Sequence, residues 1–284
     1  SRGLGDVYKR QDYCNQMYSN CQCNECTGQN CTHNCKECLD DIHFHHNRIR
    51  SKYDCEKLMY YYLCRYSYKY CSEIIYALER VDLNRYPYFN ILSLGCGGAA
   101  DLMAFDCYTD SDDDIYYHGV DINTYWNDIH SKIEELYPNA SFSTGFDVKH
   151  DIPTLSSESY NVVIIEYLIS YLYSRGSSVV SNLFDDIIEY IVSNKPHDSP
   201  MLIIINDVDS INTGRDTFKR LAEKLEDLGY DITVQKFRFK SDAYYSGSTQ
   251  YPSNQNLFEC VWEFQQKYCV PLSCESAQMI IEIE

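Results

Sequence analysis

A glycine-rich turn between an apolar strand and a helix constrains this chain more than any other stretch. Residues 90–105 read NILSLGCGGAADLMAF, in which a short apolar run enters the turn and an apolar-periodic segment leaves it. Gly95, Gly97 and Gly98 permit a tight turn with bare backbone. The free amides that begin the next helix favour polar or anionic ligand groups. The stretch therefore predicts a nucleotide-binding turn in an open α/β sheet.

Two acidic residues follow the next two predicted strands. Residues 116–120 predict a strand that ends at Asp121, where a carboxylate can accept both hydroxyls of a ribose. Residues 140–144 predict a third strand, and Asp147 comes shortly after it. This spacing is typical of mononucleotide binding at the carboxyl edge of a parallel sheet.

The segments ILSLGCGGAAD, YYHGVDIN and FSTGFDV resemble the first three motifs of class I S-adenosylmethionine-dependent methyltransferases, and the resemblance extends over about residues 91–284. It implies a Rossmann-like fold in which the glycine turn passes under the cofactor, one acidic residue holds the ribose and an Asp contacts the adenine. The residues that it assigns to the cofactor are Leu94, Gly95, Cys96, Gly97, Asp121, Ile122, Phe146 and Asp147. The chain departs from the family at Ser93, where Asp or Glu is usual, and at Ala99, where a third glycine is common.

The acceptor side is expected at the end of the fourth strand, predicted over residues 160–165. Ligands of open α/β sheets bind outside the carboxyl ends of the strands, which places Glu166 and Tyr167 at the site of chemistry. We expect these two to be the catalytic residues, with Glu166 as a general base; capping of the following helix is the alternative role for Glu166. Secondary candidates follow the fifth strand and are Asn206, Asp207 and Asp209.

The predicted fold is a doubly wound α/β domain with a mostly parallel, seven-stranded sheet. Its last two strands are predicted over residues 232–239 and 257–264 and are joined by a loop too short for a helical crossover, so they should form an antiparallel pair. Gly95, Gly97 and Ala100 also satisfy G-x-G-x-x-A, which makes NAD an alternative by motif alone. The antiparallel ending fits the methyltransferase resemblance better.

A cysteine cluster precedes this domain: seven of the 15 Cys fall between Cys14 and Cys38. Two C-x-x-C pairs, Cys23/Cys26 and Cys35/Cys38, have the spacing of a four-thiolate zinc site, and few large apolar residues surround them. The sequence therefore predicts a small zinc module. Two alternatives remain open: an iron–sulfur cluster on the C-x3-C-x2-C run that begins at Cys31, and disulfides or free thiols.

These features divide the chain into four parts. We expect a non-native or disordered tail at 1–11, a Cys-rich metal module at 12–50, a Tyr-rich helical cap at 51–82 and the Rossmann-like domain at 83–284. The tyrosines of the cap are expected mainly in the core, with a pocket lining as the alternative.

Charge and apolar runs limit the partners. Residues 1–90 carry 12 Lys and Arg against 11 Asp and Glu, whereas residues 91–284 carry 12 against 31. Such an acidic domain repels phosphate backbones, which argues against nucleic acid as its partner. With no membrane-length apolar run and no secretory signal, we expect a cytoplasmic protein. The predicted function is methyl transfer to an unknown acceptor, a small molecule or a protein; the alternative is a non-catalytic nucleotide-binding or interaction module.

Overall fold

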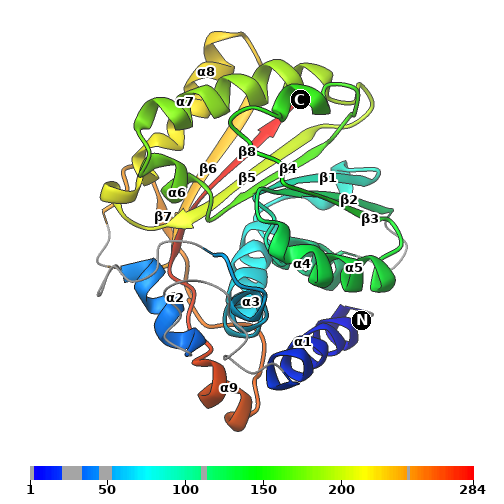
Figure 1. Ribbon diagram of the computed structural model, residues 1–284. Coiled ribbons are helices and arrows are strands. Elements are labelled where there is room, and N and C mark those ends of the chain that lie inside the picture. Colours follow the sequence, from blue (N-terminus) through cyan, green and yellow to red (C-terminus); the bar gives the residue numbers. More distant parts are fainter. Residues whose placement is uncertain (1–2, 21–33, 45–52, 110–113, 242–243) are drawn as a thin grey trace.

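A computed structural model describes residues 3–20, 34–44, 53–109, 114–241 and 244–284 of the chain (Figure 1). Its centre is one sheet with the order β3-β2-β1-β4-β5-β8-β6-β7. The strands are β1 Phe89–Leu94, β2 Ile115–Asp121, β3 Ala140–Thr144, β4 Val162–Glu166, β5 Met201–Val208, β6 Ile232–Arg238, β7 Thr249–Gln250 and β8 Ser276–Ile283. Strands β1 to β5 are parallel to one another, and β8 is antiparallel to both β5 and β6. The predicted α/β class and antiparallel ending are thus confirmed.

Helices cover both faces of the sheet, as the ribbon shows (Figure 1). The helices are α1 Gly3–Asn20, α2 Cys35–Phe44, α3 Glu56–Leu78, α4 Ala100–Tyr108, α5 Asn127–Leu136, α6 Ile169–Tyr173, α7 Ser177–Asp186, α8 Lys219–Asp227 and α9 Trp262–Tyr268, and a π-helical turn at Ile187–Ile191 follows α7. Helices α1 to α5 share one apolar core with one face of the strands, and α6 to α8 share a second core with the other face. Alternate residues of the central strands supply the two cores, as a sheet buried on both sides requires.

The end of the sheet differs from the sequence prediction in two ways. The sheet has eight strands rather than seven, because Thr249–Gln250 adds a short parallel strand beside β6. The strand predicted over 257–264 is wrong: α9 begins within this segment, and Val261 and Trp262 are largely exposed. The closing strand is β8, whose eight residues are all buried because it lies between β5 and β6.

The predicted zinc module gains no support from the structure. Cys23 and Cys26 lie outside the described residues, as does Cys31 of the iron–sulfur alternative. Cys35 and Cys38 lie in the first turn of α2 and are buried in the same apolar core as α3. Within the described ranges, no group of three or more His, Cys, Asp or Glu side chains is arranged to hold a metal ion.

The helical cap is one long helix, α3, which confirms the helical prediction for this part of the chain. Helix α3 packs on α1, α2 and α4 and reaches β5 and β8. Most of its tyrosines are buried, including Tyr60, Tyr61 and Tyr68. None of the helices in the described ranges has the length and apolarity to cross a bilayer.

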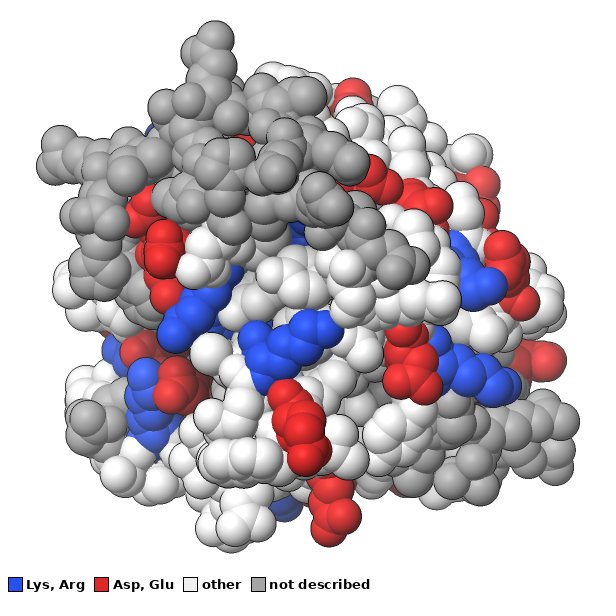
Figure 2. Space-filling model, turned by 60° about the horizontal axis from the view of Figure 1, so that its bottom comes forward, with Lys and Arg blue, Asp and Glu red and all other residues white. Residues whose placement is uncertain are grey.

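The face seen in Figure 2 carries basic and acidic side chains next to one another. Among the described residues of this face, the two kinds of charge are interspersed.

Helix α1 runs through residues 3–11, which we expected to be a disordered or non-native tail. In this helix Arg10 is 1% exposed, and its Nη2 donates to the Ala99 carbonyl at 3.2 Å and contacts the Met103 sulfur. Its Nε and Nη1 have no hydrogen-bond partner among the described residues. Burial lowers the pKa of this guanidinium, because a charge without a counter-ion is costly in an apolar core.

We therefore expect Arg10→Met to raise the free energy of unfolding by about 1–3 kcal/mol, since it removes a poorly paired buried charge and keeps a side chain of similar length. Denaturant titration of the full chain measures the change. Arg220→Met, at an exposed position on α8, is the control and should alter stability by less than about 0.5 kcal/mol. A loss of stability in Arg10→Met would contradict the reasoning.

Candidate functional site

The glycine turn joins the end of β1 to the start of α4. Gly95, Gly97 and Ala99 all have positive φ, at 71°, 49° and 52°. The amides of Gly95 and Cys96 donate to the Val120 carbonyl at 2.8 and 3.0 Å and fasten the turn to β2. Ala99, which replaces the third glycine of the motif, has the same left-handed conformation. In a residue with a Cβ this conformation carries backbone strain.

Asp121 connects this turn to the ends of the neighbouring strands. Its Oδ2 accepts the Gly97 amide at 3.0 Å, and its Oδ1 accepts the Asn123 amide at 2.8 Å. Its carbonyl accepts the Phe146 amide at 3.1 Å, so the three sequence motifs meet at one place. Burial raises the pKa of Asp121 to about 6, and the two amides that it accepts oppose this rise.

The other residues predicted for the cofactor surround this carboxylate to differing degrees. Ile122 is 51% exposed, whereas Phe146 is 9% exposed. Asp147 forms an ion pair with Lys149 at 3.0 Å, which contributes to the lowered pKa of its carboxyl together with the Lys149 amide. Leu94 is fully buried, so only its backbone can face a ligand, and the Cys96 sulfur lies 3.9 Å from Nε2 of His130.

Apolar side chains pack closely around the turn. A Cβ built on Gly98 would lie 2.1 Å from Leu63 Cδ1 of α3, so a side chain at this position would have to displace Leu63. A Cβ on Gly95 would lie 3.3 Å from Leu168, and one on Gly97 would lie 3.6 Å from Trp126. Helix α3 therefore closes the inner end of the turn, while Gly95 and Gly97 keep part of their surface exposed.

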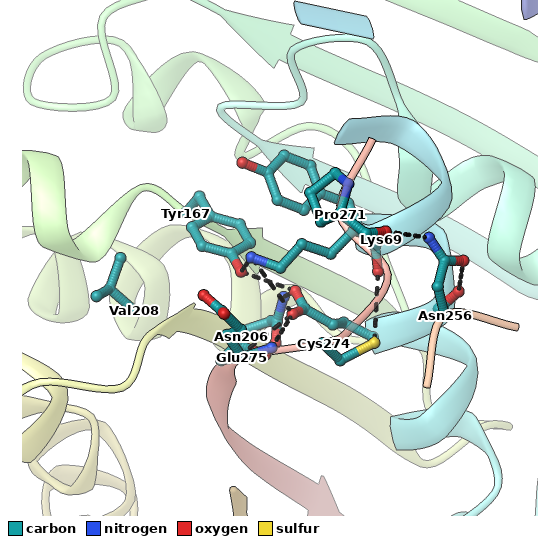
Figure 3. A network of polar contacts seen from close by, with 12 residues as sticks. Lys69, Tyr167, Asn206, Val208, Asn256, Pro271, Cys274 and Glu275 are labelled. Carbon is teal, nitrogen blue, oxygen red and sulfur yellow. Dashed lines mark hydrogen bonds and ion pairs between the residues drawn. The ribbon is translucent and has the colours of Figure 1, made fainter. Parts of the chain in front are cut away.

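A buried polar network lies where β4, β5 and β8 meet α3 (Figure 3). Its centre is Glu73, which is fully buried and accepts the Tyr167 hydroxyl at 2.8 Å and the Asn206 amide group at 3.1 Å. The backbone amides of Glu275 and Ser276 also donate to Glu73, at 2.9 and 3.3 Å. These contacts compensate most of the cost of burying the carboxylate.

Lys69, one turn before Glu73 on the same helix, completes this network. Its Nζ lies 3.7 Å from Glu73 Oε1 and donates to the Tyr167 hydroxyl at 3.0 Å. The same Nζ lies 5.1 Å from the centre of the Tyr167 ring and 5.6 Å from that of Tyr70, distances typical of cation–π contacts.

The two predicted catalytic residues are brought together with this network. Glu166 Oε1 accepts the Asn206 amide group at 2.9 Å. Burial raises the pKa of Glu166 well above its usual value, and the charges of Asp101 and Glu73 raise it further. Tyr167 has a φ of 53°, and its ring stacks on Tyr70 with 4.3 Å between centroids. Backbone strain of this kind in a non-glycine residue is frequent at functional sites.

The two remaining secondary candidates have structural partners. Asp207 accepts the Ser170 amide at 2.8 Å, and burial raises the pKa of its carboxyl to about 6. Asp209 pairs with Arg215 at 2.6 Å.

Three polar residues near the site were missed by sequence reasoning: Lys69, Glu73 and Asp101. Lys69 and Glu73 stood in a segment interpreted as a packing helix, where a Lys and a Glu four residues apart usually form an exposed pair. Asp101 stood in the first turn of a helix, where an acidic residue is ordinary. The one sequence feature that could have indicated these residues is their position in the helical segments before and after the glycine turn along the chain.

Comparisons with known proteins extend only to the level of fold. Neither a family model nor a curated protein sequence matches this chain. Among solved structures it is similar to a SAM dependent methyltransferase from Aquifex aeolicus, with 11% identity, 78% of this chain and 96% of that chain covered, and a TM-score of 0.46. It is also similar to one from Archaeoglobus fulgidus, with 18% identity, coverages of 75% and 94%, and a TM-score of 0.42.

The fit of α3 on the glycine turn predicts that Gly98→Ala lowers the free energy of unfolding by about 1–3 kcal/mol, because the added methyl group collides with Leu63. In a Leu63→Ala background the same change should cost much less. A double-mutant cycle measured by denaturant unfolding yields the coupling between the two positions. Equal costs in both backgrounds would show that Leu63 does not limit the space at Gly98.

The environment of Asp121 predicts that its carboxyl titrates near pH 6 rather than near 4. Carboxyl carbon shifts, followed by NMR between pH 3 and 8, measure the midpoint, and the Asp121→Asn variant identifies the signal. Since the pKa is raised on folding, the folded protein binds the extra proton, and stability falls as pH rises toward about 6. A midpoint near 4 would mean that the carboxylate is well solvated.

Proposed function

We propose that this chain is an S-adenosylmethionine-dependent methyltransferase whose acceptor is a small molecule or a protein. The observation that carries the proposal is the position of the Asp121 carboxylate, 3.0 Å from the Gly97 amide at the carboxyl edge of the sheet. A carboxylate in this place suits the two hydroxyls of a ribose, and the bare turn beside it admits the rest of a nucleoside.

The neighbouring residues suit an adenosine at this position. The exposed side chain of Ile122 and the ring of Phe146 offer apolar surface to a base, and the Asp147 carboxylate can accept a hydrogen bond from an exocyclic amine. Gly95 and Gly97 lie next to this surface with their backbone partly exposed. The residues present therefore fit the nucleoside part of S-adenosylmethionine.

The strand directions favour this nucleoside over NAD. A dinucleotide-binding sheet of the classic order has two parallel βαβαβ halves, so that its sixth strand continues the parallel sheet. Here the strand beside β5 is β8, which runs antiparallel to it. The sheet thus offers one parallel mononucleotide-binding half, which suits a single nucleoside.

S-adenosylmethionine supplies a methyl group on a sulfonium centre that is already activated for displacement. The protein therefore has to hold the acceptor in line and remove a proton from it. Glu166 lies at the end of β4 and is hydrogen-bonded through one oxygen to Asn206, and burial raises the pKa of its carboxyl, which increases its affinity for a proton as a general base requires. The Tyr167 hydroxyl is engaged by Glu73 and Lys69, so we assign Tyr167 to positioning, with its ring forming a wall of the acceptor side together with Tyr70.

Calorimetric titration of the purified protein with S-adenosylmethionine, S-adenosylhomocysteine and NAD tests the proposal. We expect micromolar binding of the first two and a loss of at least about tenfold in affinity in Asp121→Ala, as expected for hydrogen bonds to a charged group. Asp185→Ala, which removes a partly exposed carboxylate of α7, is the matched control and should bind as the parent does.

Transfer itself is measured by incorporation of a labelled methyl group into candidate acceptors. Glu166→Gln should lower kcat with little change in cofactor affinity. Binding of NAD alone would favour the dinucleotide alternative, and binding of none of the three would leave the non-catalytic module as the better description.

A further inference from the structure

A buried carboxylate oxygen without a partner lies beside the glycine turn. Asp101, in the first turn of α4, is 1% exposed. Its Oδ1 accepts the Tyr117 hydroxyl at 3.0 Å, whereas its Oδ2 has no hydrogen-bond partner among the described residues. A buried carboxylate oxygen that is left unpaired is costly, so the position of Asp101 requires an explanation.

The surroundings of Asp101 carry an excess of negative charge. Asp101 and Glu73 are the two carboxylates whose charges raise the pKa of Glu166, and Lys69 is the cation that opposes them. Lys69 is already shared between Glu73 and Tyr167. Arg10, the buried cation of α1, contacts the Ala99 carbonyl and the Met103 sulfur rather than Asp101.

Asp101 also lies near the position where the chain departs from its motif. Ser93 is buried at 1% exposure on β1, and its hydroxyl opposes the rise that burial causes in the pKa of Asp101. The carboxylate that the motif lacks at Ser93 is thus available from the helix on the other side of the turn.

We propose that Asp101 binds the ammonium group of the ligand's amino-acid part, with Oδ2 as the acceptor. An ammonium group would satisfy the unpaired oxygen and offset the excess of carboxylates. This inference rests on the proposed function, because it presupposes that an adenosyl amino acid occupies the turn. In this role Asp101 selects ligands that carry an amino group.

The test is a cycle between protein and ligand, measured by calorimetry on the full chain. The ligands are S-adenosylhomocysteine and its analogue in which hydrogen replaces the amino group. The proteins are the parent, Asp101→Asn, and Asp106→Asn as the matched control on the same helix, where Asp106 also accepts a tyrosine hydroxyl, that of Tyr137, at 3.3 Å.

We expect loss of the amino group to weaken binding to the parent and to Asp106→Asn by about tenfold or more, and binding to Asp101→Asn by less than about twofold. Asp101→Asn should bind S-adenosylhomocysteine correspondingly more weakly. Without ligand, its denaturant midpoint should be at least as high as that of the parent, since the substitution removes a buried charge. If Asp101 had only a structural role, Asp101→Asn would bind both ligands more weakly by the same factor.

The outcomes separate the two proposals. If the parent binds S-adenosylhomocysteine but does not distinguish it from the deaminated analogue, the role of Asp101 is refuted and the proposed function stands. This arm uses the parent protein alone, so it holds even if Asp101→Asn does not fold. If the parent binds no adenosyl ligand, the proposed function fails and this inference fails with it.

Discussion

The arrangement of this protein depends on one buried carboxylate. Glu73 on α3 accepts hydrogen bonds from the end of β4 through Tyr167, from β5 through Asn206, and from the start of β8 through two backbone amides. Removing such a group, or one of its charged partners, typically costs about 3–5 kcal/mol, because the remaining polar atoms stay buried without partners. Glu73 thus holds the helical cap and the sheet together as one unit.

Fixing α3 in this way determines what surrounds the glycine turn. Lys69, four residues before Glu73, donates to the Tyr167 hydroxyl. Nearer the N-terminus of the same helix, Leu63 fills the space that a side chain at Gly98 would need. The same helix presents Tyr70 to the ring of Tyr167. The inner end of the turn and the acceptor side are therefore shaped by one helix, whereas the nucleoside side is shaped by the ends of β2 and β3.

The sequence was informative where structure depends on neighbouring residues. The glycine turn, Asp121 and α3 were predicted because turn chemistry, strand ends and helical periodicity are local signals. Strand β8 was missed because its place between β5 and β6 is decided by pairing with strands that begin about 75 and 45 residues earlier in the chain. The cluster of Cys residues suggested metal ligands by spacing, yet Cys14, Cys35 and Cys38 pack in an apolar core, where a thiol behaves as a small hydrophobic group.

The site itself shows the same limit more sharply, since its charges come from elements far apart in the sequence. The charges of Asp101 on α4 and of Glu73 on α3 raise the pKa of Glu166 on β4, although nothing in their local sequences indicates that they meet. Ser93, read along the strand, looks like the loss of an acidic ligand; in space, a carboxyl group from the following helix lies beside it. A motif read from sequence describes which residue type stands at a position, but the chemistry of a site depends on which groups reach the same volume. Three carboxylates near a single lysine cost stability in the free protein, and such a cost is typical of sites arranged for a ligand rather than for folding.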